Sequence, residues 1–225
     1  MEETKEEKKA ECREKAYANL LCDFMFKRMF CSEANKDVLI WFLNMVLEDV
    51  DIVDVDFTPT EHLGLTEEDR KVIFDISCTC NDGKTFIIEM QCYDQRNFFK
   101  RCVSYASKVY SLQSEMGDRN KYDIPPVYMV GILGKDFTME TDPPKDKHTF
   151  YYEFMEKDTG RVVCETISII FVELHHFDKP LSECKSIVEK WCYCLKNIGS
   201  MSRLPAELQE EVFRRFFEAA EIAHF

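Results

Sequence analysis

Hydrophobic positions recur along the chain with two spacings, and each spacing predicts a different kind of element. Apolar residues repeated every three to four positions are typical of amphipathic helices, whereas alternating or short continuous apolar runs are typical of strands. By this criterion helices are predicted at 17–30, 35–47, 97–116, 187–196 and 205–223, and strands at 52–57, 74–80, 86–91, 127–133, 150–154 and 166–174.

The order of these elements predicts an α/β fold, with a mixed central sheet and helices on its faces. Two helices and a strand come first, then a strand hairpin, a long helix and further strands and helices. No internal repeat or low-complexity linker divides the chain, so we expect one main domain. It would span 16–200, with a charged tail or helix extension at 1–15. A helix at 201–225 would pack on the domain or extend from it.

The loop of the hairpin decides which side chains face each other. Apolar and polar residues alternate on its first strand, so one face is apolar and the other carries Asp75. A three-residue loop, Asn81-Asp82-Gly83, with glycine in the left-handed conformation, sets Asp75 directly opposite Glu89. A two-residue loop would set Asp75 opposite Met90 and bury its carboxylate in the core, because a one-residue slip exchanges the faces. We therefore expect the three-residue loop.

This pairing predicts a metal site at Asp75 and Glu89. Facing side chains on one side of a sheet have Cβ atoms roughly 5 Å apart, and like charges placed there are destabilising. Carboxylate oxygens are the ligands that hard divalent cations such as Mg²⁺ prefer. We expect both carboxylates on one open face of the sheet, which Gln91 shares. The alternative is a solvent-facing pair that binds no metal.

The charge of the chain limits where nucleic acid could bind. With 29 Lys and Arg against 42 Asp and Glu, the formal net charge is −13, which argues against a general polyanion binder. Residues 96–108, after the hairpin, instead carry an excess of positive charge, and Asp94 is the only acid near them. The candidate DNA contacts are Arg96, Lys100, Arg101, Lys108 and Gln113. The alternative is a solvated helix face.

Composition sets the remaining limits. The chain has 225 residues, 45% of them hydrophobic, which is enough for a substantial core. It contains no run of eighteen apolar residues, so we expect no membrane span, and 1–15 lacks the apolar stretch of a signal peptide. Eleven cysteines without a secretion signal favour reduced thiols in the cytoplasm over a disulfide framework. Cys78 would pack in the core rather than bind metal.

Several segments, taken in order, carry a resemblance to a known family. They are Asp23-Phe24-Met25-Phe26-Lys27, Leu39-Ile40 with Phe42-Leu43-Asn44, Phe74-Asp75, Phe86-Ile87-Ile88-Glu89-Met90-Gln91, Arg101 with Tyr105, Tyr110 and Gln113, and Pro126-Val127-Tyr128. Across about 19–174 the chain resembles the PD-(D/E)xK nuclease family transposases, also called the recombination-promoting nuclease or putative transposase family.

The resemblance implies a restriction-endonuclease-like core that cleaves DNA phosphodiesters with Mg²⁺, for which Mn²⁺ can substitute. It implies that Asp75 and Glu89 are metal ligands. Asp23 matches a recurrent acidic position of the family and would be an outer ligand. From the sequence alone, Asp23 could instead cap the helix that begins near it.

One position departs from the wider superfamily. Gln91 stands where that superfamily carries a lysine, and by resemblance it would orient the attacking water or a phosphate oxygen. A glutamine cannot supply the positive charge that a lysine gives to the transition state. Arg101 or Lys100 from the following helix would supply that charge instead.

Three functions therefore remain open at this stage. The first is a metal-dependent DNA endonuclease that serves recombination or a mobile element. The second is a catalytically silent relative that acts as an interaction module, which the acidic balance and Gln91 favour. The third is a nuclease toxin or defence effector with another nucleic-acid target. The sequence leaves the oligomeric state open, with a homodimer as one arrangement.

Overall fold

The structure is a computed structural model, and it describes residues 17–47, 49–62, 72–116, 123–134, 137–139 and 141–221. The tail expected at 1–15 lies outside the described residues. Among the described helices, none is long and apolar enough to cross a membrane.

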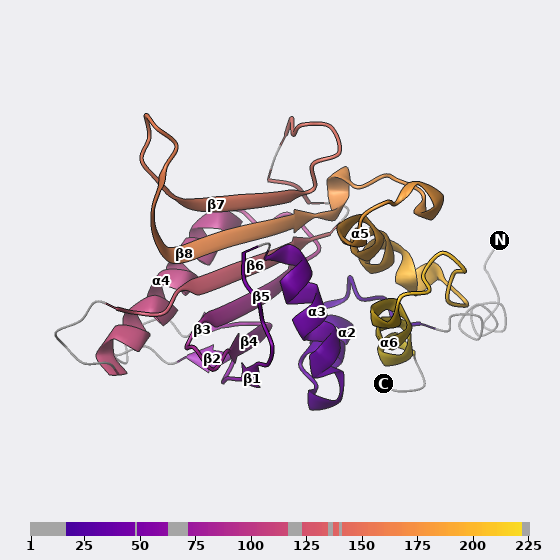
Figure 1. Cartoon of the computed structure of the whole chain (residues 1–225), viewed down its shortest axis with the longest axis horizontal. Coiled ribbons are helices and arrows are strands. Elements are labelled where there is room, and N and C mark those ends of the chain that lie inside the picture. Colours follow the sequence, from indigo (N-terminus) through magenta and orange to yellow (C-terminus); the bar gives the residue numbers. More distant parts are fainter. Residues whose placement is uncertain are drawn as a thin grey trace, which may run out of the picture.

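A six-stranded mixed sheet forms the centre of the molecule, as predicted (Figure 1). Its strands lie in the order β1 (Asp56–Phe57), β4 (Ile76–Thr79), β5 (Thr85–Gln91), β6 (Val127–Leu133), β8 (Val162–Glu173) and β7 (Thr149–Met155). β5, β6 and β8 are parallel, whereas β1, β4 and β7 pair antiparallel with their neighbours. A separate two-stranded sheet pairs β2 (Glu61–His62) with β3 (Val72–Ile73).

Helices cover both faces of the sheet. In Figure 1, α2 and α3 lie in front of the sheet, and α5 and α6 lie to the right of these two helices. Helix α4 lies behind the sheet. The helices are α2 (Asp23–Phe30), α3 (Lys36–Val46), α4 (Phe98–Met116), α5 (Ile187–Asn197) and α6 (Glu211–Ala220). Short 3₁₀ turns occupy Glu33–Asn35, Leu174–His176, Leu181–Glu183 and Ile198–Ser200. The fold is thus a three-layer α/β arrangement.

Each face of the sheet has its own apolar cluster. Phe86, Ile88 and Met90 of β5 contribute to the larger cluster with α2, α3, α5 and α6. Ile87 points the other way, into the cluster that α4 covers. Because both faces are covered, all seven residues of β5 are buried. The open face expected for the carboxylates is therefore wrong, since Glu89 is only 6% exposed.

The predicted register of the hairpin is confirmed. Ile76 lies opposite Ile88 and Thr79 opposite Thr85, a register that places Asp75 across from Glu89. Gly83 has a φ of +85°, and a Cβ there would lie 2.7 Å from a Pro125 side-chain carbon. Only glycine therefore fits this position of the loop without strain.

One residue of the hairpin departs from the predicted alternation. Phe74 was expected beside Ile76, but it packs with Ile87 and the Tyr105 ring on the α4 side. The physical reason is that β4 starts only at Ile76, after a bend at Asp75. Cys78 lies in the larger core cluster, as predicted.

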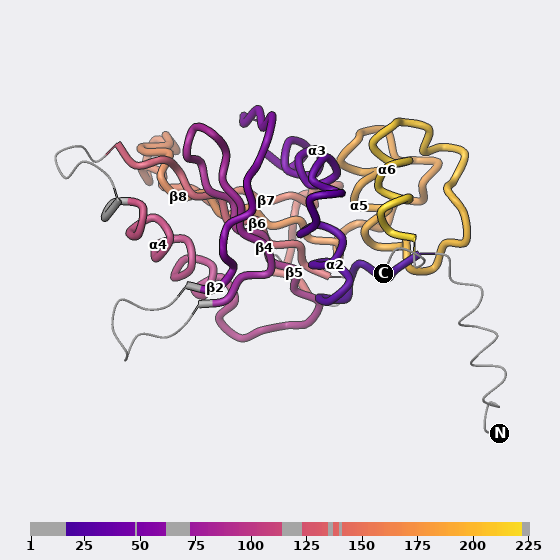
Figure 2. Tube along the Cα trace, turned by 90° about the horizontal axis from the view of Figure 1, so that it is seen from below, coloured from indigo at the N-terminus to yellow at the C-terminus, as the bar shows by residue number. Residues whose placement is uncertain are grey.

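Helix α2 begins at Asp23 rather than at position 17. Before it, the Ala18 N–H donates to the Ala220 carbonyl at 2.8 Å and Tyr17 bridges to Glu221, and a turn at 20–21 then leads into the helix. Figure 2 shows this start of the described chain beside the end of α6. α6 itself starts at Glu211 rather than 205, after turns that place Leu208 in the core.

The strand predicted at 52–57 is also shorter than expected, since only Asp56–Phe57 pairs with β4. At Ile52 the side chain of Asn44 takes the place of a neighbouring strand. It accepts from the Ile52 N–H and donates to the Ile52 carbonyl, both at 2.8 Å. By contrast, the helices predicted at 35–47 and 97–116 and the strand at 127–133 are confirmed to within one residue.

Candidate metal centre

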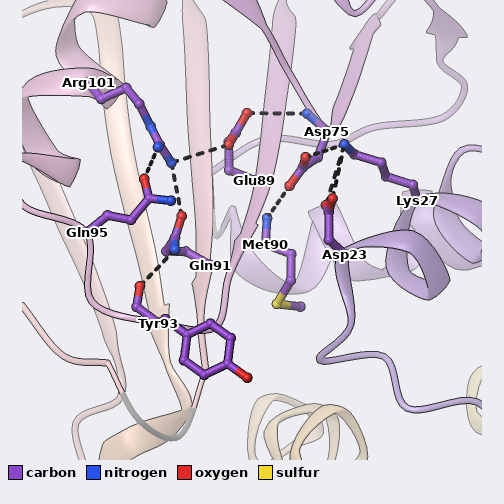
Figure 3. A network of polar contacts seen from close by, with 9 residues as sticks. All are labelled: Asp23, Lys27, Asp75, Glu89, Met90, Gln91, Tyr93, Gln95 and Arg101. Atoms are coloured by element: carbon purple, nitrogen blue, oxygen red, sulfur yellow. Dashed lines mark hydrogen bonds and ion pairs between the residues drawn. The ribbon is translucent and has the colours of Figure 1, made fainter.

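Asp75 and Glu89 lie together where the hairpin meets α2 and α4 (Figure 3). The Asp75 N–H donates to Glu89 Oε1 at 3.3 Å, and Asp75 Oδ2 accepts from the Met90 N–H at 2.8 Å. The backbone pairing of β4 with β5 ends at Ile76 and Ile88, and these two hydrogen bonds join the next residues, Asp75 with Glu89 and Met90. The predicted opposition of Asp75 and Glu89 in the hairpin is thus borne out, although the two carboxylates contact helices on opposite faces of the sheet.

Each carboxylate has a cation beside it. Lys27 Nζ on α2 is 2.8 Å from Asp75 Oδ1, and Arg101 Nη2 on α4 is 3.7 Å from Glu89 Oε2. The carboxylate side chains are only 12% and 8% exposed, so solvent screens these pairs less than pairs on a free surface. Since α2 and α4 cover opposite faces, the two cations approach the carboxylates from two sides.

The surroundings of Glu89 disfavour its charged form. Gly131 is its register neighbour on β6, and a Cβ there would lie 2.7 Å from the Phe171 ring, so this ring fills the space beside the strand. Burial raises the pKa of Glu89 to about 8, with a further contribution from the charge of Asp75, while Arg101 opposes the shift. Without a bound cation, Glu89 is therefore largely protonated at neutral pH.

The pKa of Asp75 is also raised, because burial outweighs the opposing contacts with Lys27 and the Met90 N–H. Two carboxyl groups with raised pKa values, facing each other in a buried place, are typical of functional sites. Structural ion-pair networks also shift pKa values, so the metal assignment depends on the donor set as well.

Gln91 is occupied by protein partners. Its amide oxygen accepts from Arg101 Nη2 at 3.0 Å, and its amide nitrogen donates to the Tyr93 carbonyl at 2.7 Å. Arg101 also donates to Gln95 Oε1 and lies over the Phe98 ring, 4.9 Å from its centre. In this arrangement Gln91 orients Arg101. The predicted contact of Gln91 with water or phosphate would use the second N–H of its amide nitrogen or the second lone pair of its amide oxygen.

Asp23 lies at the rim of the site. Its side chain is 62% exposed and its Oδ1 is 3.5 Å from Lys27 Nζ, so Lys27 stands between Asp23 and Asp75. The capping alternative does not describe it, because α2 begins at Asp23 itself and has no side-chain cap bond. For Asp23 to serve as an outer ligand, the ammonium of Lys27 would have to move.

The candidate DNA contacts divide into two groups. Arg96 and Lys100 are exposed at the amino end of α4, next to Arg101. Gln113 instead donates to Thr85 Oγ1 at 3.1 Å, at the opposite end of β5 from Gln91. It lies about 18 Å along α4 from Arg101, and Lys108 lies between them. The structure therefore brings Arg101 to Glu89 and places Arg96 and Lys100 at the same end of α4, whereas Gln113 lies at the other end.

The donor set fits a divalent cation of the Mg²⁺ type. Such ions are held by one or two carboxylates and complete their coordination with waters and substrate phosphates. Asp75 and Glu89 supply the two carboxylates. Within the described residues no group of three His, Cys, Asp or Glu side chains could hold a metal ion.

Two residues of the site were not predicted from the sequence. Lys27 appeared only within a matched segment, although its position four residues after Asp23 on a helix was a readable sign of an ion pair. Its contact with Asp75 joins distant segments and leaves no local pattern. Gln95 lies in the loop after β5 and likewise had no periodic signal.

Fold and site together define a class: an α/β domain in which a hairpin of a mixed sheet presents two facing carboxylates. The comparison with protein families agrees, because the model of the PD-(D/E)XK nuclease family transposases matches residues 20–225. The chain therefore belongs to this family, and its fold is of the restriction-endonuclease-like α/β type. No curated protein and no solved structure was found to match the chain.

Proposed function

We propose that the protein is a metal-dependent endonuclease that hydrolyses DNA phosphodiester bonds, with Asp75 and Glu89 as ligands of Mg²⁺ or, in its place, Mn²⁺. Membership of a nuclease family supports the reaction class. The observation that carries the proposal is the pair of buried carboxyl groups on opposed residues of the hairpin, whose two ionised forms a divalent cation would compensate. We further propose a role in recombination or in a mobile element, in the cytoplasm.

A cation bound there would polarise a phosphoryl oxygen and lower the pKa of a bound water. The residues around it have their own tasks. Glu89 must lose its proton to act as a ligand, so the site loads more readily as the pH approaches about 8. Arg101, held by Gln91 and Gln95, presents a fixed positive charge beside the reacting phosphate.

DNA would approach over the amino end of α4. Arg96 and Lys100 are exposed there, and the first turn of α4 contains no acidic residue. The chain as a whole carries a net charge of −13, so its other surfaces should repel DNA. Binding should therefore be weak, confined to this end of α4, and strongly dependent on salt.

A second candidate function is an interaction module without catalysis. The observation that favours it is that Lys27 already neutralises Asp75, so the carboxylates are compensated without a metal. In that case the ion pairs of Asp75 with Lys27 and of Glu89 with Arg101 would hold α2 and α4 against the hairpin.

Cleavage of supercoiled plasmid separates the two functions. Purified protein is incubated with plasmid in Mg²⁺, Mn²⁺ or EDTA, beside Asp75→Asn and Glu89→Gln and with an RNA substrate in parallel. The proposal expects nicking with either cation, none with EDTA, and loss in both variants. Cleavage of RNA alone would favour the toxin or defence effector. No divalent-dependent cleavage of either nucleic acid would favour the interaction module.

A further inference from the structure

Lys27 occupies an unusual place among the basic residues of the site. Its Nζ lies 2.8 Å from Asp75 Oδ1 and 3.5 Å from Asp23 Oδ1, so one ammonium bridges a buried acid and an exposed one (Figure 3). The Lys27 side chain is 36% exposed, which places its charge at the boundary between the carboxylates and solvent. A substrate phosphate entering from solvent would meet this charge.

Arg101 provides a fixed charge near the phosphate, but it cannot change partners as Lys27 can. Its guanidinium donates to Gln91 and Gln95 and stacks over the Phe98 ring, so it is fixed in one orientation. A lysine is a compact charge on a flexible stem of four carbons, and it can move with a ligand. Lys27 is therefore the cation that can change partners without disrupting the network on the α4 side.

We propose that Lys27 is a catalytic residue, whose ammonium contacts a non-bridging oxygen of the scissile phosphate when a divalent cation takes over Asp75. This inference rests on the proposed nuclease function and deepens it. It adds from α2 a second, mobile positive charge to the fixed charge of Arg101, at a site where Gln91 provides none. Asp23 retains the ammonium at the rim of the site while Asp75 binds the cation.

The step balances without a further reactant. The oxygen of a water molecule forms a bond to phosphorus as the bond from phosphorus to one sugar oxygen breaks. The leaving sugar oxygen takes up a proton from solvent and the attacking water releases one to solvent. Lys27 stays protonated throughout and neutralises the charge that develops on the phosphoryl oxygen.

The chain provides a matched control. Lys36, at the start of α3, also bridges two carboxylates, Glu33 at 3.1 Å and Asp54 at 3.6 Å, and its side chain is 22% exposed. Lys36→Met therefore removes a lysine that also bridges two carboxylates, here two exposed ones, from a neighbouring helix away from Asp75 and Glu89. Lys27→Met and Lys27→Arg are compared with it in thermal melting, Mn²⁺ titration and single-turnover plasmid cleavage.

We expect Lys27→Met to lower single-turnover cleavage by about 100-fold or more. Lys27→Arg should recover part of that loss, and Lys36→Met should cleave like wild type. Mn²⁺ should bind Lys27→Met several-fold more tightly than wild type, since a cation that competes for Asp75 has been removed. This second measurement does not depend on activity.

Three results would overturn the inference. Cleavage by Lys27→Met within about threefold of wild type would remove Lys27 from the reaction while leaving the nuclease function standing. Weaker Mn²⁺ binding together with lower melting would make Lys27 a structural residue. A wild-type protein that cleaves under no condition would overturn the proposed function and the role of Lys27 with it.

Discussion

The two cations beside the carboxylates approach from opposite faces of the sheet and are held in different ways. On the α4 side, Arg101 donates to Gln91 and Gln95, and these contacts fix its orientation. On the α2 side, Lys27 pairs with Asp75 through a flexible side chain that remains partly exposed. The charge is the same on both sides, but the freedom to move is not.

This difference suggests a division of tasks. The Arg101 side chain is 29% exposed, but its guanidinium makes hydrogen bonds to two amides and lies over a ring, so moving it breaks several contacts at once. A half-exposed lysine loses little when it changes partner, since solvent and a ligand can replace the contact. We therefore expect substitutions on the α4 side to affect both stability and cleavage. Those on the α2 side should affect mainly cleavage.

The largest effect is expected for Arg101→Met. At pH 8.5, where Glu89 is mostly ionised, this substitution leaves the Glu89 carboxylate buried without its cation and removes the partner of the Gln91 amide. We expect a loss of about 2–3 kcal/mol in the free energy of unfolding, measured with urea, together with loss of cleavage. Arg101→Lys should not restore either property, because a lysine cannot reproduce the forked geometry. An unchanged free energy of unfolding in Arg101→Met would show that Arg101 is held no more firmly than Lys27.

The next effect concerns pH and Glu89. Its pKa of about 8 in the folded chain lies above its usual value of 4.5, so folding favours the protonated carboxyl. The stability that this group contributes is complete below about pH 4.5 and is lost as the pH rises through 8. Without metal, wild type should lose about 2.5 kcal/mol between pH 6 and pH 8.5, relative to Glu89→Gln. Urea unfolding at the two pH values measures this, and equal losses in both proteins would contradict the burial argument.

A smaller effect is expected at the exposed end of α4. Arg96→Glu combined with Lys100→Glu should weaken DNA binding by about tenfold and lower the slope of affinity against salt by about two. The control is Lys157→Glu with Arg161→Glu, an exposed basic pair beside the turn between β7 and β8. Fluorescence anisotropy across a salt series distinguishes the two pairs. Equal losses would mean that binding is diffuse rather than directed by α4.

The smallest effect is expected for Gln113→Ala. Its bond to Thr85 joins α4 to the start of β5, far from the carboxylates. Loss of one such hydrogen bond should lower the free energy of unfolding by about 0.5–1 kcal/mol and leave DNA binding unchanged. If the same anisotropy series showed weaker binding, the DNA path would extend along the whole of α4.

The sequence contained enough information to predict the hairpin. Alternation and a glycine-ended loop determine its register, and both are local properties of the chain that need no knowledge of the rest of the fold. The same holds for α4, whose apolar stripe is long enough to identify its extent. The facing of Asp75 and Glu89 could be predicted for this reason.

The surroundings of the carboxylates could not be predicted in the same way. That α4 covers the face of Glu89 depends on how a helix packs after the chain leaves β5, and no periodicity encodes it. The approach of Lys27 to Asp75 depends on the docking of α2 against β5, which brings distant segments together. The expectation of an open face failed for the first reason, and Lys27 was missed for the second.

The most direct test of the central claim is a calorimetric titration of the metal-free protein with Mn²⁺ at pH 7, in two buffers of different ionisation enthalpy. We predict one bound cation per chain with release of up to about one proton, because Glu89 must lose its proton to bind. Asp75→Asn and Glu89→Gln should each abolish the binding. Absence of binding in wild type, or binding that persists in both variants, would contradict the assignment of Asp75 and Glu89 as the metal centre.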